Sequence, residues 1–330
     1  MSKKIFLVPL LIMSLVAFGC SSSDSNGSSE VDDQLKKIGI LQLVEHPALD
    51  NAREGFIQGL KNAGWEEGKN IKIEYHNAQN DQSNLQTMSK KLVTGQMDLI
   101  LGIATPTAIA LANETQEIPI LFTAVTDPVS AKIVNSMEKP GTNVTGTTDM
   151  NPIKEQLELL LQIVPDTKKL GVIYNAGEVN SQVQVEILKE KALELGINEI
   201  VEAIVANASE VMQGAQSLVG RVDAIYVPTD NTVVSAFAAV VQVAEENKIP
   251  LFTGEQSPLV FGGVGTVGID YFTLGMQTAE MAVRILEGSN PADMPVESQK
   301  EPKLVINKSG AERLGVEIPE EILNAAEFIE

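Results

Sequence analysis

Residues 98–128 read DLILGIATPTAIALANETQEIPILFTAVTDP, and this stretch decides the fold class. The apolar run 99–103 is too short for a core helix and ends at a Thr-Pro-Thr turn, so it predicts a buried strand that leads into a helix. A second apolar run, 120–124, ends in Thr-Asp-Pro and predicts the next buried strand. The pattern is typical of a β-α-β unit, in which polar residues collect at the ends of parallel strands, where open sheets bind ligands.

The same pattern returns later in the chain. From Asp223 the sequence DAIYVPTDNTVVSAFAAVVQVAEENKIPLFTGEQSP repeats the order of Asp, strand, Thr, helix, Ile-Pro, strand and Thr. Upstream, KKIGILQLV from Lys36 is matched by KKLGVIYNA from Lys168. A duplication of this length predicts an α/β protein with two doubly wound, Rossmann-like lobes, each with its own parallel sheet. A small ligand is then expected between the lobes.

The N-terminal residues have the features of an export signal. Two lysines precede the apolar run 5–18, which is too short to span a bilayer comfortably, and Gly19 stands directly before Cys20. We expect residues 1–19 to be removed and Cys20, the only cysteine, to carry a lipid; the alternative for a lone cysteine is an inert core residue. The polar composition of residues 20–35 predicts a flexible tether. The protein is therefore expected to be extracytoplasmic and lipid-anchored to the cell membrane.

Charge and motif content exclude several classes of function. The chain carries 24 basic and 44 acidic residues, for a net charge of -20, which argues against binding to nucleic acid. The sequence contains no HExxH pair, no phosphate-binding GxxxxGK[ST] loop and no GxSxG elbow. His46 and His76 fall in different predicted loops, so they do not form a metal-binding pair. We therefore predict a protein that is not an enzyme and that uses no cofactor and no metal.

Polar residues that follow the strands of the first half are candidate ligand contacts. Thr105 and Thr107 stand at a helix start, whose free N–H groups and hydroxyls suit a carboxylate. Thr123, Thr126 and Asp127 follow the neighbouring strand and could complete the site. For the helix start and for Asp127 the alternative is a simple helix cap. Glu45, in the polar turn VEHPALDN after the first strand, is a further candidate.

In the second half the candidate contacts suit a cation such as an α-ammonium group. They are Asn175, Glu178, Asn180, Ser181, Asp230, Asn231 and Asp270. We expect Asp230 to bind the ammonium group, because in the duplication it corresponds closely to Thr105 and would face it across the cleft. For Ser181 and Asp230 the alternative is again a helix cap. An apolar side-chain pocket is expected from residues near loop ends, namely Leu43, Tyr174, Tyr271 and Phe261.

Two further features are expected to lie away from the site. Trp65, the only tryptophan, falls in a helix-to-strand turn at the end of the sheet opposite to the polar loops, so we expect it to be a surface or packing residue. The charge-rich segment 317–330 predicts a solvated helix at the end of the chain; the alternative is a binding tail.

The chain also resembles a known family. The strings LVEHPALD, ATPTA, FTAVTDP, YNAGEVNS, VPTDN and GTVGIDY, behind a lipobox-like start, resemble the tryptophan/tyrosine-type family of ABC transporter substrate-binding lipoproteins. The resemblance implies the type I periplasmic-binding-protein fold, in which two lobes joined by a three-segment hinge close on the ligand. It also implies an aromatic amino acid, such as tryptophan, phenylalanine or tyrosine, as the ligand, and ABC permease and ATPase subunits as partners of a monomeric receptor.

The resemblance and the duplication together divide the chain and its site. We expect one lobe to comprise 36–147 and 272–300, and the other 148–271 and 301–330. By resemblance the ligand contacts are Thr105, Thr107, Thr123 and Asp127 on one lobe and Asn175, Asn180, Ser181, Asp230 and Asn231 on the other. Two alternatives remain open: a ligand-sensing module for a signalling partner, and a receptor for another small solute such as a branched-chain amino acid, a nucleoside or a sugar.

Overall fold

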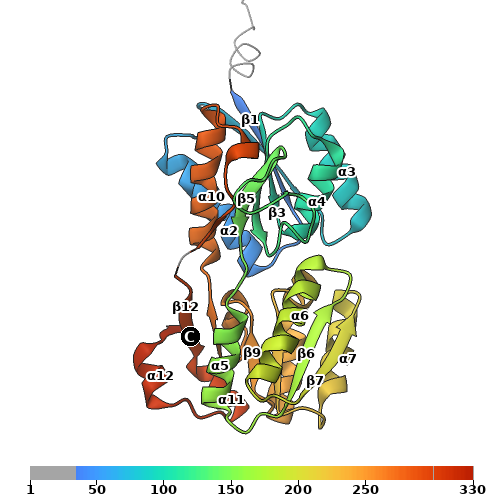
Figure 1. Ribbon diagram of the computed structural model, residues 1–330, viewed down its shortest axis with the longest axis vertical. Coiled ribbons are helices and arrows are strands. Elements are labelled where there is room, and N and C mark those ends of the chain that lie inside the picture. The colour runs from blue at the N-terminus through green and yellow to red at the C-terminus, as the bar shows by residue number, and fades with distance from the viewer. Residues whose placement is uncertain (1–34, 300, 330) are drawn as a thin grey trace, which may run out of the picture. The chain divides into compact units, whose positions relative to one another are not determined.

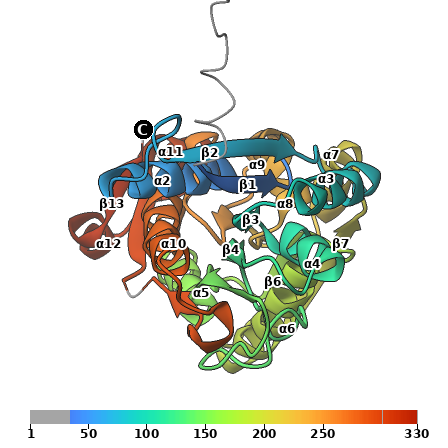
Figure 2. The same ribbon diagram turned by 90° about the horizontal axis from the view of Figure 1, so that it is seen from above.

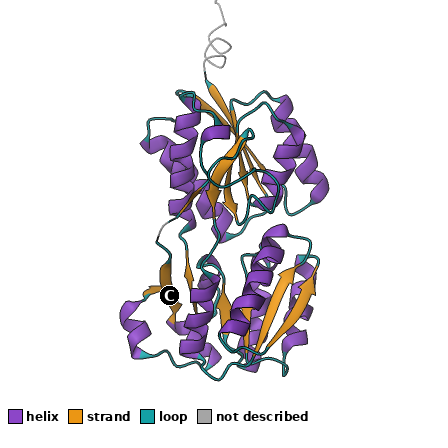
Figure 3. Cartoon of the chain, viewed as in Figure 1, coloured by secondary structure: helices purple, strands orange, loops and turns teal. Residues whose placement is uncertain are grey.

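The computed structural model describes residues 35–299 and 301–329. The predicted signal peptide, the lipidated Cys20 and all but the last residue of the predicted tether lie outside the described residues. Contacts group Lys36–Glu330 into one compact unit, and within it the buried apolar side chains form two separate clusters, one in each lobe. In Figure 3 the strands of each lobe lie between helices. No helix among the described residues is both long and apolar enough to cross a membrane.

Lobe 1 is built on a parallel sheet of six strands in the order β11-β5-β4-β3-β1-β2. These strands are β1 (Lys36–Gln42), β2 (Ile71–Asn77), β3 (Leu99–Ile103), β4 (Ile120–Val125), β5 (Val144–Thr148) and β11 (Glu297–Ser298). Strands β3, β4 and β5 are buried along their whole length, as expected of a sheet covered on both faces.

Four helices cover the sheet of lobe 1. They are α2 (Pro47–Asn62), α3 (Gln82–Thr94), α4 (Thr105–Glu114) and α10 (Tyr271–Leu286). Helices α2 and α10 lie on one face of the sheet, and α3 and α4 lie on the other (Figures 1 and 2). Helix α10 therefore belongs to lobe 1, although it follows lobe 2 in the sequence.

Lobe 2 contains two sheets. Four parallel strands in the order β7-β6-β8-β9 form the larger sheet: β6 (Lys169–Asn175), β7 (Glu199–Val205), β8 (Ala224–Val227) and β9 (Leu251–Thr253). The smaller sheet has the order β10-β12-β13, with β10 (Gly265–Gly268), β12 (Lys303–Asn307) and β13 (Glu327–Ile329). The helices of lobe 2 are α5 (Ile153–Ile163), α6 (Val179–Glu194), α7 (Val211–Leu218), α8 (Asn231–Ser235), α9 (Phe237–Asn247), α11 (Lys308–Leu314) and α12 (Glu320–Ala325).

The end of the chain differs from the prediction of a single helix over residues 317–330. Helix α12 ends at Ala325, and β13 then pairs in parallel with β12. Because β12 is already paired with β10 on its other side, β13 completes this sheet by covering an edge that would otherwise be open. The prediction of a solvated helix over this whole segment was therefore wrong.

The chain passes between the lobes after β5, after β10 and after β11. The first passage, residues 149–152, leads from the lobe 1 sheet into α5. The second, residues 269–270, leads from β10 of lobe 2 into α10 of lobe 1. Short connections of this kind absorb the change in backbone angles when two lobes open and close, so these passages are the expected hinge.

Helices α2 and α10 pack with their backbones in contact. A Cβ atom at Gly275 would lie 2.0 Å from the carbonyl oxygen of Ala52, and a Cβ atom at Gly55 would lie 2.0 Å from that of Phe272. Only glycine permits this approach, because any side chain would overlap the opposite backbone. Trp65 lies just beyond the end of α2 and packs, half-buried, against the lobe 1 cluster.

Candidate ligand-binding site

A small cavity lies between the two lobes. It is lined by His46, Ala48, Leu49, Ala124, Thr126, Asp149, Asn180, Thr229, Asp230, Asn231, Glu255 and Tyr271. The cavity has a volume of about 10 Å³. A space of this size holds about one water molecule, so a larger ligand enters only when the lobes move apart.

The lining residues lie at the carboxyl ends of parallel strands, which is where we predicted the site from the sequence. Thr126 and Asp149 follow β4 and β5 in lobe 1, and Asp230 and Glu255 follow β8 and β9 in lobe 2. This is where ligands bind in open α/β sheets, because the loops of neighbouring strands meet at the same edge.

The backbone is bent where two neighbouring strands of lobe 1 end. Ala104, after β3, has φ 87°, and Ala124, in β4, has φ 57°. The pairing of β4 with β5 shifts its register at this point. A left-handed conformation of a residue other than glycine costs about 1–3 kcal/mol and is concentrated at functional sites. The bend places Ala124 in the wall of the cavity.

Three buried carboxyl groups surround the cavity. Asp149 accepts hydrogen bonds from Thr126 Oγ1 at 2.9 Å and from the hydroxyl of Tyr271 at 2.8 Å, and burial raises its pKa. Burial also raises the pKa of Glu255, to about 8, and the negative charges of Asp149 and Asp230 add to this shift. The pKa of Asp230 is raised by its burial and then by the nearby Glu178. A cation in the cavity would relieve the mutual repulsion of these groups.

The buried carboxylate of Glu178 holds together the lobe 2 side of the cavity. Its Oε1 accepts hydrogen bonds from the backbone N and the Oγ1 of Thr232, at 3.0 and 2.7 Å. Its Oε2 accepts from Nδ2 of Asn180 and from both the backbone N and Nδ2 of Asn231. Glu178 is thus occupied by donors of its own lobe, and it orients the amide groups of Asn180 and Asn231.

Two hydrogen bonds connect the lobes beside the cavity. Nδ2 of Asn80 donates to Thr232 Oγ1 at 3.2 Å. His46 Nε2 lies 3.5 Å from Asn231 Oδ1, and burial lowers the pKa of His46 to about 4. His46 is therefore neutral at pH 7. Because Asn231 directs its Nδ2 to Glu178, its oxygen faces His46, which requires the proton on Nε2 and leaves Nδ1 as an acceptor.

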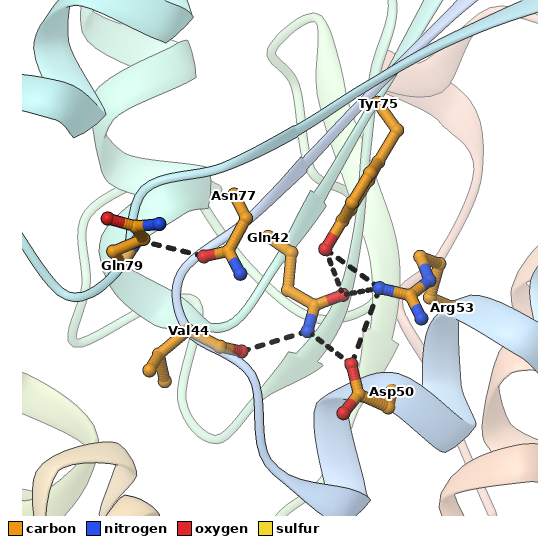
Figure 4. Close-up of polar contacts among 7 residues, drawn as sticks. All are labelled: Gln42, Val44, Asp50, Arg53, Tyr75, Asn77 and Gln79. Atoms are coloured by element: carbon orange, nitrogen blue, oxygen red, sulfur yellow. Dashed lines mark hydrogen bonds and ion pairs between the residues drawn. The ribbon is translucent and has the colours of Figure 1, made fainter.

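A polar cluster supports the loop that carries His46 (Figure 4). Nε2 of Gln42, at the end of β1, donates to the carbonyl oxygen of Val44 and to Asp50 Oδ1, each at 2.8 Å. Nη1 of Arg53 donates to Gln42 Oε1 at 2.9 Å and to the hydroxyl of Tyr75 at 2.7 Å. The cluster joins β1, β2 and α2, and it fixes the backbone just before His46.

Some predicted contacts are found in or directly behind the cavity wall. Asn180, Asp230 and Asn231 line the cavity. Asn175 donates its backbone N–H, and Ser181 its hydroxyl, to Asp230 Oδ2, both at 2.6 Å. Asp230 also caps α8, because its Oδ1 accepts from the backbone N–H three residues later at 2.8 Å. Asp230 is thus both a cap and part of the cavity wall, and its contact with an ammonium group stays a prediction.

Apart from Thr126, the predicted threonines of lobe 1 do not line this cavity. Thr105 borders a neighbouring groove together with Glu178, and its buried Oγ1 has no partner among the described residues. Thr107 Oγ1 donates to the carbonyl oxygen three residues earlier at 2.6 Å. Thr123 Oγ1 accepts from Thr147 at 3.1 Å. The hydroxyls of Thr107 and Thr123 are therefore used inside lobe 1.

The remaining predicted contacts also lie outside the cavity lining. Asp127 accepts from the backbone N–H groups two and three residues later, and Asp270 caps α10. Glu45 is exposed. Among the residues expected to form an apolar pocket, Tyr271 lines the cavity and Leu43 borders another groove. Phe261 is 46% exposed, and the hydroxyl of Tyr174 donates to Glu202.

Thr126, one of the predicted contacts, lines the cavity, but several other lining residues were missed from the sequence: His46, Asp149, Thr229 and Glu255. Asp149 and Glu255 follow β5 and β9, so the rule that found Asp230 also applies to them. His46 was considered only as a metal ligand or catalytic group. Within the ranges that the structure describes, no cluster of three or more His, Cys, Asp or Glu residues is suited to a metal ion.

Two lobes with parallel sheets, joined by a hinge and enclosing a polar cavity at their strand ends, define a binding protein that closes on a small ligand. The fold is that of type I periplasmic binding proteins. The family model described as ABC transporter substrate binding protein matches residues 37–329. The chain therefore belongs to the ABC transporter substrate-binding proteins, which are extracytoplasmic receptors and not enzymes. The predicted fold class and family are confirmed.

Individual relatives agree with this assignment. The tyrosine-binding protein of Clostridioides difficile (strain R20291) is 45% identical over 304 residues, which cover 91% of this chain and 88% of that protein. The structure of an ABC domain in complex with L-Trp from Streptococcus pneumonia is 40% identical, with a TM-score of 0.86, covering 90% of this chain and 100% of the other.

A third relative is known from a ligand-free, open structure. The ligand-free, open structure of a substrate-binding protein with adhesive properties from Clostridium difficile is 46% identical, covering 90% of this chain and 99% of the other, with a TM-score of 0.69. The similarity in structure is thus greater to the L-Trp complex, although the identity in sequence is lower.

Proposed function

We propose that this chain is the receptor of an ABC uptake system and that it captures an aromatic amino acid between its two lobes. The observation that carries the proposal is the cavity between the lobes, which combines buried carboxyl groups with the first turn of a long helix. The names of two relatives, a tyrosine-binding protein and a domain in complex with L-Trp, support an aromatic side chain.

The two ends of a zwitterion would find complementary groups in this cavity. Helix α2 begins at Pro47, and Ala48 and Leu49 of its first turn line the cavity. The first N–H groups of a helix have no partner within the helix and carry a partial positive charge, so they suit the ligand carboxylate. Asp149 and Glu255 supply negative charge for the ammonium group.

Capture requires movement of the lobes. An amino acid is much larger than the space now available, so the lobes open to admit the ligand and close over it. The hydrogen bonds of His46 with Asn231 and of Asn80 with Thr232 cross from lobe to lobe and would form only on closure. These contacts would favour the closed form once the ligand fills the cavity.

The proposal is tested by calorimetric titration of the protein, freed of bound solute, with tyrosine, tryptophan, phenylalanine, leucine and myo-inositol. We expect the aromatic amino acids to bind more tightly than leucine, and myo-inositol not to bind. Solution scattering of the same samples should give a smaller radius of gyration with the tight ligand. Selective binding of leucine or of myo-inositol would contradict the aromatic assignment.

We further propose that Cys20 anchors the mature protein as a monomeric lipoprotein, since the apolar run and Gly19 precede it directly. Cys20→Ala should move the protein from the membrane fraction into the soluble fraction. The physical reason is that each buried CH₂ of an acyl chain contributes about 0.8 kcal/mol to membrane binding, which a variant without the thiol loses. Fractionation with immunoblotting measures the distribution, and a variant that stays membrane-bound would rule out this anchor.

A further inference from the structure

The cavity presents hydrogen-bond acceptors that lack donors. Among the described residues, four buried side-chain atoms have no hydrogen-bond partner, and three of them belong to residues that line the cavity. These three atoms are Nδ1 of His46, Oδ1 of Asn180 and Oε2 of Glu255. A buried polar atom without a partner costs about 1–3 kcal/mol, so such a cluster marks a place where a ligand supplies the missing hydrogen bonds.

The surrounding contacts make the atoms of Asn180 and His46 acceptors. Asn180 donates its Nδ2 to Glu178 Oε2 at 3.0 Å and to the carbonyl oxygen of Thr229 at 3.0 Å, which turns its oxygen to the other side. His46 directs Nε2 to the oxygen of Asn231, and a neutral imidazole has only one N–H, so Nδ1 accepts. Glu255 Oε2 has no partner, and it is an acceptor in the charged form of the carboxyl group, which a bound cation favours.

We infer that these three atoms form a subsite for the primary ammonium group of the ligand, an assignment that rests on the proposed function. A primary ammonium group has three N–H donors and no acceptor, and it therefore matches three acceptors that lack donors. A single water molecule could donate to only two of them. The subsite draws its atoms from both lobes, since His46 precedes α2 of lobe 1 and Asn180 and Glu255 belong to lobe 2. Binding of the ammonium group therefore couples recognition to lobe closure.

The charges around the cavity favour the same ligand group. Its lining includes the carboxyl groups of Asp149, Asp230 and Glu255 and contains no Lys or Arg. The pKa of Glu255 is raised by burial and by its two acidic neighbours, so an approaching cation stabilises its charged form. Asp149 and Asp230 already accept hydrogen bonds from groups of the protein, whereas Glu255 Oε2 is free to accept from the ligand.

The inference is tested with three related ligands on the unaltered protein. L-Tyrosine carries both charged groups, tyramine lacks the carboxylate, and 3-(4-hydroxyphenyl)propionate lacks the ammonium group. Calorimetry should show the propionate binding at least about a hundredfold more weakly than L-tyrosine, the size of effect expected when a buried charge loses its partner. Equal binding of the propionate and of L-tyrosine would overturn the subsite.

A variant pair then assigns the effect to Glu255. Glu255→Gln should weaken L-tyrosine at least about tenfold and leave the affinity for the propionate unchanged, since only the former carries the group that Glu255 binds. The control Glu199→Gln changes an exposed glutamate of the same lobe, paired with Lys169, and should leave both affinities unchanged. Equal loss for both ligands in Glu255→Gln would mean a structural role and would overturn the assignment.

The outcome also separates this inference from the proposed function. If L-tyrosine binds but the ammonium group and Glu255 make no difference, the receptor function stands and the subsite is wrong. If no amino acid binds but tyramine does, the subsite stands and the proposed ligand class is wrong. If neither L-tyrosine nor tyramine binds, both are wrong.

Discussion

Gly275→Ala is expected to lower the free energy of unfolding by about 3 kcal/mol, at the upper end of the usual cost of overpacking. The new methyl group would lie 2.0 Å from the carbonyl oxygen of Ala52 and 2.8 Å from the backbone N of Phe56. Backbone atoms cannot rotate away, so helices α2 and α10 must separate. The gain of about 1 kcal/mol from replacing glycine in a helix does not offset this cost. Urea denaturation followed by circular dichroism measures the change.

The matched control is Gly214→Ala in α7. There the nearest atoms to a new Cβ are side-chain methyl groups, Val205 Cγ1 at 2.8 Å and Ile173 Cδ1 at 3.0 Å, which can shift by small rotations. We expect this variant to lose less than about 1 kcal/mol, because the clash is relieved and helix propensity improves. If Gly275→Ala is as stable as Gly214→Ala, the close contact of α2 with α10 does not limit the packing of lobe 1.

The second large effect is that the ligand-free protein loses stability as the pH rises from about 6.5 to about 8. The free energy of unfolding falls by up to about 2 kcal/mol for each carboxyl group that keeps its proton over this pH range. Glu255 has a folded-state pKa of about 8, raised by burial and then by Asp149 and Asp230. Above pH 6.5 the unfolded chain has lost this proton while the folded chain still holds it. The contribution of Glu255 to the free energy of unfolding is therefore present at low pH and is lost as the pH approaches 8.

The other titrating groups around the cavity define this window. The pKa values of Asp149 and Asp230 are raised by burial, so they change stability in the same direction. His46 acts in the opposite direction, because its pKa is lowered to about 4, but its effect is complete once the unfolded chain has lost its proton above about pH 6.5. The pKa values of Tyr226 and Tyr271 are raised and lie above the window.

Thermal and urea denaturation at a series of pH values measures this dependence. Above pH 6.5 the slope of the free energy of unfolding against pH should correspond to about one proton fewer in Glu255→Gln than in the unaltered protein. The variant should also be more stable than the unaltered protein at pH 8, because the amide has no proton to lose. Glu199→Gln, at an exposed position, should keep the original slope. Identical slopes in the unaltered protein and in Glu255→Gln would show that Glu255 does not hold a proton in this range.

The duplicated pattern of strands and turns was sufficient to predict the two lobes. Apolar runs such as 99–103 became buried strands, and the polar residues after β8 reached the cavity wall, since both follow directly from the geometry of parallel sheets. The direction of a particular side chain was not predictable in this way. Thr107, in the first turn of the helix after β3, and Thr123, in β4, lie near the predicted end of the sheet but use their hydroxyls within lobe 1.

Two other features of the site had no signal in a single sequence. The left-handed conformations of Ala104 and Ala124 depend on the surrounding packing, because alanine has no preference for them. His46 has no neighbouring residue in the sequence that marks it as a ligand contact. Its role depends on Asn231 from the other lobe, which is distant in the sequence. Contacts that form across the two lobes are the part of the site that local patterns do not encode.

The position of the only tryptophan determines what the protein's own fluorescence can report. Trp65 lies beyond the end of α2 and packs against lobe 1, and it is absent from the lining of the cavity between the lobes. Its emission will therefore follow the unfolding of lobe 1 and will be nearly insensitive to ligand binding. An added tryptophan ligand contributes the only other indole in the sample, so a spectral shift on mixing can be assigned to the ligand itself.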